Sequence, residues 1–338
     1  MKVCTKVRRT LLLPDTLCLL LMLAFALITA RAPLFAQQRT KTGSFAPPAT
    51  AKDDDNRIAI STELVSLTVT VTDKQGRYVA GLDRNAFAVY EDGVRQEIGF
   101  FSNRDAPASV GIVFDVSGSM TGEKIRRAKE ALRRFIQTSH AEDEYSLVSF
   151  NERAELLLDR TRDGEALLSQ FGNVKPQGNT ALYDAVALGL EAVARGRHPK
   201  RVLIVISDGE DNHSRTDFVQ VRRKLQDADV TIYTVLIGPL LPRSNGGVVM
   251  DNLASASGGK SYFPGNAEAM SEAFEQIALE LRRQYSVGYT PLNPTTDGKW
   301  RSMKVAVQSP VAPRLVVRFR KGYYAIGRNS GDKVNMMK

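Results

Sequence analysis

The chain has 338 residues, of which 43% are hydrophobic and 25% charged, and its formal net charge is +9. This length allows two domains, or one domain with an appendage, and the composition is typical of a globular protein with a sizeable core. Without the first 36 residues, which contain five basic residues and one acid, the net charge falls to +5. Such a mild charge, in a chain whose start indicates export, argues against a nucleic-acid partner.

Residues 1–36 have the pattern of a signal peptide. A basic start is followed by an apolar run at 17–28, and the segment ending at Ala36 matches a small-residue cleavage site. A retained membrane anchor is the alternative, although Pro14 and Asp15 leave the apolar run shorter than the ~20 residues of a spanning helix. We therefore expect export to the periplasm, the cell surface or the medium, with no membrane span in the mature chain.

Both cysteines, Cys4 and Cys18, lie in this leader. The mature chain would then have no disulfide, which fits bacterial export better than eukaryotic secretion. Residues 37–57 are polar and contain prolines, as expected of a linker.

Residues 58–106 indicate an N-terminal β segment. Apolar residues alternate with threonines from 67 to 72, the period of a half-buried strand. Two further strands are predicted at 87–90 and 94–101, around the turn Glu91-Asp92-Gly93.

Residues 107–284 have a different pattern, in which apolar runs at 110–114, 145–150, 202–207 and 230–237 alternate with helical stripes. Strands that are apolar on both faces are covered by helices on both sides. The pattern predicts a doubly wound, mostly parallel α/β sheet.

The β pattern returns at 285–326, before a tail at 327–338. Strands are predicted at 285–290, 303–307 and 315–319, and we expect them to pack with the N-terminal β segment in one small β domain. The α/β domain would then be an insertion, and two unrelated flanking pieces are the alternative. Trp300 is expected to pack within this C-terminal β segment.

Oxygen-bearing side chains follow several of the predicted strands. Ligands of a doubly wound sheet bind beyond the carboxyl ends of its strands, where three loops present such groups. Mg²⁺ and Mn²⁺ prefer oxygen ligands in octahedral geometry. The candidate metal ligands are Asp115, Ser117, Ser119, Thr180 and Asp208. Two carboxylates with three neutral hydroxyls leave room for a further anion, so the site suits capture of a partner's carboxylate.

This order of residues resembles the metal-ion-dependent adhesion site of von Willebrand factor A domains, over about 107–284. The matching motifs are Asp115-Val-Ser-Gly-Ser119, Gly178-Asn-Thr180 and Ser207-Asp-Gly209. The resemblance implies a doubly wound sheet with an antiparallel edge strand, expected at 153–158, and a bound Mg²⁺ or Mn²⁺. It also implies direct ligation by Ser117, Ser119 and Thr180, with one or both aspartates acting partly through water.

The flanking segments are similar to a related family described mainly from Acidobacteria. The similarity lies in 71–82, in 87–93, in 285–291 and in Arg320-Lys-Gly-Tyr-Tyr. This similarity identifies a related family but does not imply a function.

Simpler interpretations exist for several of these residues. Ser119 or Thr121 could cap a helix that begins near Glu123. Glu210 and Asp211 are expected in a solvated loop, Asp184 in solvent or in a local cap, and His213 at the surface. The basic residues of 124–134 are expected to form the solvated face of an amphipathic helix.

Enzyme motifs are incomplete in this sequence. The segment 118–124 lacks the spacing of a phosphate-binding loop, and no G-x-S-x-G motif or triad pattern surrounds a serine. An aspartyl phosphotransferase would usually have a second acid where this chain has Ser117. We therefore predict a non-enzymatic, Mg²⁺- or Mn²⁺-dependent adhesion or assembly module for a protein with an exposed acidic residue. The alternatives are a structural protein braced by its metal and a metal-assisted hydrolase.

Overall fold

The computed structural model describes residues 64–171, 176–238, 244–309 and 314–326, so the predicted leader, linker and tail lie outside the described residues. The strands are β1 (Val65–Asp73), β2 (Phe87–Glu91), β3 (Val94–Gln96), β4 (Ile98–Ser102), β5 (Ala108–Asp115), β6 (Glu144–Phe150), β7 (Ala154–Thr161), β8 (Lys200–Ser207), β9 (Thr231–Leu236), β10 (Lys260–Tyr262), β11 (Tyr285–Tyr289), β12 (Trp300–Val307), β13 (Leu315–Arg318) and β14 (Gly322–Tyr324). The helices are η1 (Arg84–Ala86), α2 (Glu123–Thr138), α3 (Gly164–Gln170), α4 (Leu182–Ala194), α5 (Phe218–Asp227), α6 (Asn245–Ala256) and α7 (Ala267–Arg283).

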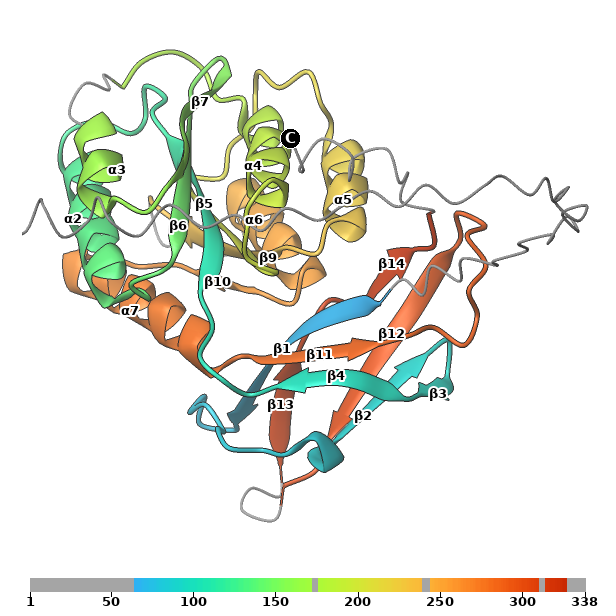
Figure 1. The fold of residues 1–338 in the computed structure, drawn as a ribbon. Helices are drawn as coiled ribbons and strands as arrows, with labels where there is room; N and C mark the ends of the chain where they lie inside the picture. The colour runs from blue at the N-terminus through green and yellow to red at the C-terminus, as the bar shows by residue number, and fades with distance from the viewer. Residues whose placement is uncertain (1–63, 172–175, 239–243, 310–313, 327–338) are drawn as a thin grey trace, which may run out of the picture. The chain divides into compact units, whose positions relative to one another are not determined.

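A six-stranded sheet forms the centre of the α/β part, in the order β10-β9-β8-β5-β6-β7 (Figure 1). Its strands are parallel except for β7, which runs antiparallel to β6 at one edge. The predicted doubly wound fold is therefore confirmed. The antiparallel edge strand expected at 153–158 is also present, as β7.

Helices cover both faces of this sheet because successive strand residues point to opposite sides. Ile112 and Phe114 of β5 pack in one layer with α2, α3 and α7, whereas Val113 packs in the other with α4, α5 and α6. Gly111 permits close packing on the second face, since a Cβ there would lie 2.4 Å from the Val193 side chain. No helix among the described residues is long and apolar enough to cross a membrane.

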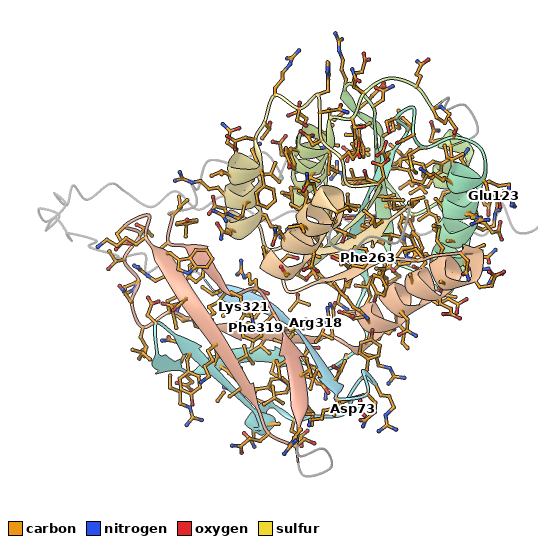
Figure 2. All side chains as sticks on the ribbon, turned by 180° about the vertical axis from the view of Figure 1, so that it is seen from behind. Asp73, Glu123, Phe263, Arg318, Phe319 and Lys321 are labelled. Carbon is orange, nitrogen blue, oxygen red and sulfur yellow. The ribbon has the colours of Figure 1, made fainter. Side chains whose placement is uncertain are left out.

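The β part consists of two four-stranded sheets, in the orders β13-β1-β11-β4 and β14-β12-β2-β3. The two sheets share one apolar core. Figure 2 labels Asp73 and Arg318, the last residues of the antiparallel neighbours β1 and β13. Strand β1 also pairs with β11, and β2 with β12, so the predicted packing of N-terminal with C-terminal strands is confirmed. Trp300 packs there as predicted, with its ring centroid 5.2 Å from that of Tyr324.

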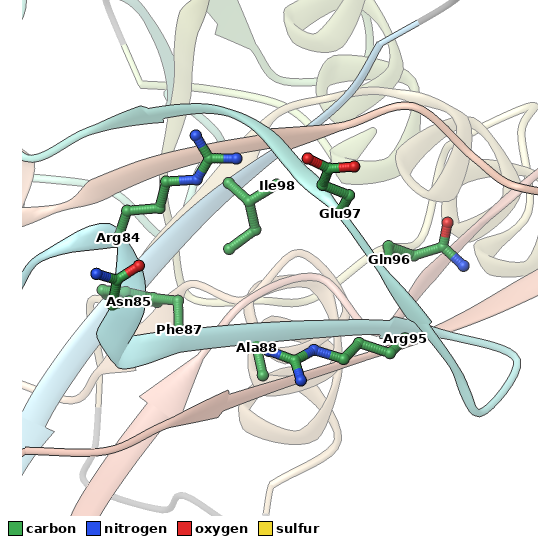
Figure 3. A pocket seen from close by; sticks show the side chains of 8 residues that line it. All are labelled: Arg84, Asn85, Phe87, Ala88, Arg95, Gln96, Glu97 and Ile98. Atoms are coloured by element: carbon green, nitrogen blue, oxygen red, sulfur yellow. The ribbon is translucent and has the colours of Figure 1, made fainter.

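The single strand predicted at 94–101 is wrong. The chain forms β3, breaks at Glu97 and continues as β4 in the other sheet (Figure 3). Gln96 is buried at the end of β3, where its side-chain oxygen accepts the Leu292 N–H at 3.0 Å. An apolar pattern does not reveal this crossing, because both halves have strand-forming residues.

A buried carboxylate joins α7 to the β part. Glu280 of α7 has no exposed surface, and its carboxylate accepts hydrogen bonds from Thr70 at 2.9 Å and Tyr233 at 2.7 Å. It also accepts from Tyr78 at 3.0 Å and forms an ion pair with Arg318 at 2.5 Å. This charge therefore has donors from β9 of the α/β part and from β1 and β13 of the β part.

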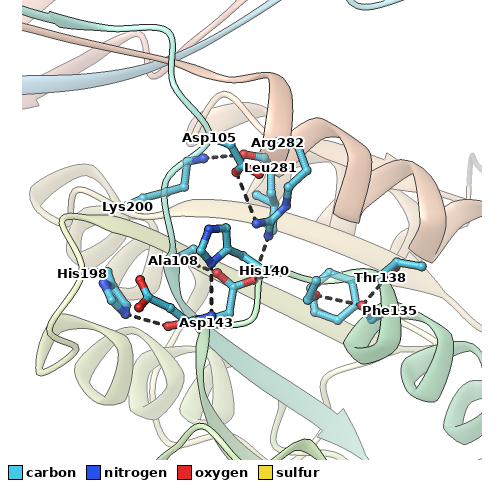
Figure 4. A network of polar contacts seen from close by, with 12 residues as sticks. Asp105, Ala108, Phe135, Thr138, His140, Asp143, His198, Lys200, Leu281 and Arg282 are labelled. Atoms are coloured by element: carbon cyan, nitrogen blue, oxygen red, sulfur yellow. Dashed lines mark hydrogen bonds and ion pairs between the residues drawn. The ribbon is translucent and has the colours of Figure 1, made fainter.

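A second buried carboxylate holds the start of β5 (Figure 4). Asp143 accepts the backbone N–H of Ala108 at 2.7 Å and that of His140 at 2.9 Å. Its other partner is the Arg282 guanidinium at 2.7 Å. Nearby, the Lys200 ammonium donates to the Leu281 carbonyl.

The Lys200 ammonium is expected to make stability rise with pH above about 8. Burial lowers the pKa of Lys200 from 10.5 to about 8, helped by the Arg282 charge. Between these values the unfolded chain binds more protons than the folded chain, so raising the pH favours folding. The gain between pH 8 and about pH 9.5 is roughly 2 kcal/mol.

Urea unfolding of the native chain and of Lys200→Met over this pH range measures the effect. The difference in unfolding free energy between the two proteins should grow in favour of the native chain as the pH rises. Parallel curves would show that Lys200 does not change its protonation on unfolding.

Candidate metal centre

The predicted site residues lie at the carboxyl ends of neighbouring strands. Asp115 is the last residue of β5, and Asp208 follows directly after β8, which pairs with β5 in parallel. Thr180 lies two residues before α4. Because parallel strands end at the same edge of a sheet, the fold places the three loops at this edge.

Hydrogen bonds connect the first loop to the third. The Ser117 and Ser119 hydroxyl oxygens are 3.2 Å apart, and the Ser119 hydroxyl donates to the Asp208 carboxylate at 2.5 Å. The backbone N–H of Ser117 donates to Asp115 at 2.8 Å. Four of the five predicted residues therefore form one connected group of oxygen atoms.

Asp115 is fully buried, and both of its carboxylate oxygens have donors. Ser117 donates to one of them through its backbone, and the Ser207 hydroxyl donates to the other at 2.6 Å. Burial raises the pKa of Asp115, and the charge of Asp208 adds to this, while the hydrogen bonds of Ser117 and Ser207 act against it. A carboxylate engaged in this way suits contact with a metal through water.

Sequence reasoning assigned no role to Ser207, although it positions Asp115. Its hydroxyl is fully buried and also accepts the N–H of Gly209 at 3.0 Å. The sequence did contain a signal for this role, because Ser207 is a polar residue at the end of a run of valine and isoleucine.

The backbone of Thr180 is fixed by the third loop. Its N–H donates to the Asn212 side chain at 2.9 Å, and its carbonyl accepts the N–H groups of Asn212 and His213. The nearby Gly178 carbonyl accepts the Gly118 N–H at 3.1 Å, which links the second loop to the first. Thr180 is only 5% exposed, yet its hydroxyl forms no hydrogen bond with any described residue. The hydroxyl is not one of the fully buried polar atoms without a partner, so it is accessible and free for a ligand.

The capping interpretation is wrong for these residues. Helix α2 follows Gly122, which has a φ of 59° and no side-chain cap. Helix α4 follows Ala181, also without a side-chain cap. The hydroxyls of Ser119 and Thr180 therefore do not serve to start these helices.

Two acids near the site hold loops together. Asp211 was expected in a solvated loop, but its carboxylate accepts the Tyr183 N–H at 3.2 Å and the Ser214 hydroxyl at 2.5 Å. Asp184 was expected in solvent or in a local cap, but its carboxylate accepts the N–H groups of Arg215 and Thr216, 31 and 32 positions later. The start of α4 and the third loop are thus tied together by these two carboxylates.

Arg126, Arg133 and Arg134 of α2 are exposed, as predicted for a solvated face, whereas Lys129 is partly buried and donates to the Phe171 carbonyl. Arg126 and Arg127 donate to Glu123, which Figure 2 labels, and these hydrogen bonds lower the pKa of Glu123 to about 2. Lys124 differs from them, because its ammonium donates to the Ser119 carbonyl at 3.0 Å. The metal-centre loop is therefore held from the helix as well.

Glycine at 209 is required by the third loop. Its φ is 81°, and a Cβ there would lie 2.5 Å from the carbonyl oxygen of Gly246.

Among the described residues, no group of three or more His, Cys, Asp or Glu side chains could hold a metal ion. A metal at this edge would therefore depend on hydroxyls together with two carboxylates, a donor set that fits Mg²⁺ or Mn²⁺.

Comparisons with known proteins agree with the fold. Residues 110–210 match the family model of the von Willebrand factor type A domain. An uncharacterised protein of Synechocystis is 28% identical over 192 residues, covering 56% of this chain and 44% of that protein. Inter-alpha-trypsin inhibitor heavy chain H1 of Mesocricetus auratus is 30% identical over 128 residues, covering 34% of this chain and 14% of that protein. The chain thus spans less than half the length of these relatives.

Two solved structures are similar to part of this chain. The von Willebrand factor type A protein from Catenulispora acidiphila has a TM-score of 0.47 at 15% identity and covers 76% of this chain and 78% of its own. The PilB minor pilin from Streptococcus sanguinis has a TM-score of 0.41 at 12% identity and covers 52% of this chain and 61% of its own.

Proposed function

This chain contains a von Willebrand factor type A domain, and on that premise we propose that it is an exported protein-binding module that depends on Mg²⁺ or Mn²⁺. The metal would be held at the edge of the central sheet by the five predicted residues. A carboxylate of a protein partner would complete its coordination, so the chain would serve in adhesion or assembly and not in catalysis.

The observation that carries this proposal is the hydrogen-bonded group of side-chain oxygen atoms from the first and third loops, with the second loop tied to both through its backbone. The Ser117 hydroxyl lies within hydrogen-bond distance of Ser119, and the Ser119 hydroxyl donates to Asp208, while the Thr180 hydroxyl has no partner among the described residues. The Thr180 hydroxyl is not one of the fully buried polar atoms that lack a partner, so a ligand can reach it. The hydroxyls of Ser119 and Thr180 do not cap α2 and α4, so metal ligation accounts for them better.

Each residue has a distinct part in the proposal. The hydroxyls of Ser117, Ser119 and Thr180 would be direct ligands. Asp115, whose oxygens already accept two hydrogen bonds, would act through water, and Asp208 would balance the metal's charge from the opposite loop. The bound cation would supply a positive charge for an incoming carboxylate. Three direct hydroxyl ligands leave positions of an octahedral shell open, and an incoming carboxylate would fill one of them.

Calorimetric titration of Mn²⁺ and Mg²⁺ tests the metal site. We expect one saturable site that is lost in Thr180→Val and in Asp115→Ala, while Thr121→Val on the neighbouring exposed position binds as the native chain does. At a metal concentration of 100 Kd the native chain should gain about 2.7 kcal/mol in unfolding free energy. Undiminished binding by Thr180→Val would contradict the proposed ligand set.

Capture of a carboxylate is tested separately from metal binding. A surface that carries glutamate peptides should retain the chain in Mn²⁺ and release it in EDTA, and a glutamine surface should not retain it. Metal binding without such retention would indicate a cation that only braces the fold. Metal-dependent turnover of a phosphoester, lost in Asp208→Ala, would instead favour a hydrolase.

A further inference from the structure

A pocket of about 450 Å³ lies in the β part, between η1, β2 and the turn from β3 to β4. Its lining includes Arg84 and Asn85 of η1, Arg95 of β3 and Glu97 (Figure 3). None of the predicted metal ligands belongs to it. The pocket therefore calls for a separate explanation.

The pocket exists because β3 ends early. Strand β3 pairs with β2 only from Val89 to Glu91, whereas β12 pairs with β2 from Phe87 onward. On the β3 side, Phe87 and Ala88 have no strand beside them, since the chain leaves for the other sheet at Glu97. Strand β4 is likewise the last strand of its sheet among the described residues. An open stretch of strand edge therefore forms one wall of the pocket.

Two guanidinium groups face this region without acidic partners. Arg84 and Arg95 are exposed, and neither side chain forms a hydrogen bond or an ion pair with any described residue. Arg301 and Arg318 of the same β part do have carboxylate partners. Figure 3 shows Arg84 reaching over the pocket from η1 and Arg95 extending back along β2 toward Ala88. The pocket thus offers two unneutralised cations.

We propose that this pocket binds an extended acidic segment of a partner protein. The segment would lie beside Phe87 and Ala88 as an added strand, and its carboxylates would pair with Arg84 and with Arg95. Guanidinium groups match carboxylates in charge and in planar geometry, and an open strand edge offers the backbone groups that strand addition uses.

This second contact is independent of the metal centre, so its test is made in EDTA. The probe is the fluorescent peptide acetyl-Thr-Glu-Val-Glu-Thr-amide, and its anisotropy is followed at low salt. We expect saturable binding that falls at least tenfold in the double variant Arg84→Gln, Arg95→Gln. The matched control is Arg153→Gln, an exposed arginine in the turn between β6 and β7, and it should bind as the native chain does.

Two further probes separate strand addition from simple anion binding. The peptide with glutamine in place of glutamate should bind at least tenfold more weakly, and glutarate should not compete at concentrations comparable to the peptide. Equal binding by the double variant, or no binding by the native chain, would overturn the proposal. Glutarate that bound as tightly as the peptide would overturn the strand addition. Circular dichroism checks that the variants, all changed at exposed positions, remain folded.

Discussion

Replacement of Glu280 by alanine is expected to lower the free energy of unfolding by about 3–5 kcal/mol. The carboxylate is completely buried and accepts hydrogen bonds from Thr70, Tyr78 and Tyr233 as well as from Arg318. Its removal leaves these donors and the Arg318 charge without their acceptor. Urea unfolding of the native chain and of Glu280→Ala measures the cost.

The matched control is Glu275→Ala on the same helix, because Glu275 is half exposed and only 3.7 Å from an exposed Arg134. This exposed pair should contribute less than about 1 kcal/mol. The double variant Glu280→Leu, Arg318→Met should recover part of the loss, since it removes both charges together. A cost below about 1 kcal/mol for Glu280→Ala would show that the network does not stabilise the folded state.

Replacement of Asp143 by alanine is expected to cost a similar amount, about 3–5 kcal/mol, but with a local signature. The change removes the acceptor for the Ala108 and His140 N–H groups and the partner of Arg282. The Ala108 amide lies at the first residue of β5, so its hydrogen exchange should accelerate more than that of amides in β11. Exchange measured by NMR, together with urea unfolding, tests both parts.

Glu142→Ala provides the control for Asp143, because the neighbouring Glu142 side chain is 61% exposed. We expect little change from it in stability or in exchange. The loss of stability in Asp143→Asn should lie between those of Asp143→Ala and Glu142→Ala, since an amide oxygen can still accept one N–H. If Asp143→Ala unfolded at the same urea concentration as the control, the proposed anchoring of β5 would be wrong.

The α/β part was predictable because its strands are apolar on both faces. The runs ending at Asp115 and Ser207 could only be buried strands, and the order of the motifs then placed Thr180 and Asp208 at one edge. Helices α3 and α6 were not predicted. Helix α3 is short, and α6 begins with Gly246 and Gly247, which have low helix propensity, so its sequence pattern is weak.

The residues that hold the loops of the candidate site in place could not be predicted from the sequence. Asn212, Asp211 and Ser214 act through hydrogen bonds to the start of α4, some 30 positions earlier in the chain. Sequence spacing does not reveal such pairs, because the loops meet only after the sheet has formed. The same reason applies to Glu280, which is one charged residue of an amphipathic helix until strands from both ends of the chain surround it.

The division of the β part between the two ends of the chain determines when it can fold. Val65 pairs with Tyr289 and Thr70 with Arg318, partners more than 200 positions apart. The ribosome synthesises the N-terminal end first. Strands β1 to β4 therefore cannot complete their sheets, and their apolar faces stay uncovered, until the last strands have been synthesised. The α/β part, whose six strands pair only with one another, needs no such delay. Non-local pairing of this kind slows folding and exposes strand edges to aggregation. A nascent chain that stopped after α7 would therefore have a complete α/β unit, whereas β1 to β4 would lack the C-terminal strands with which they pair.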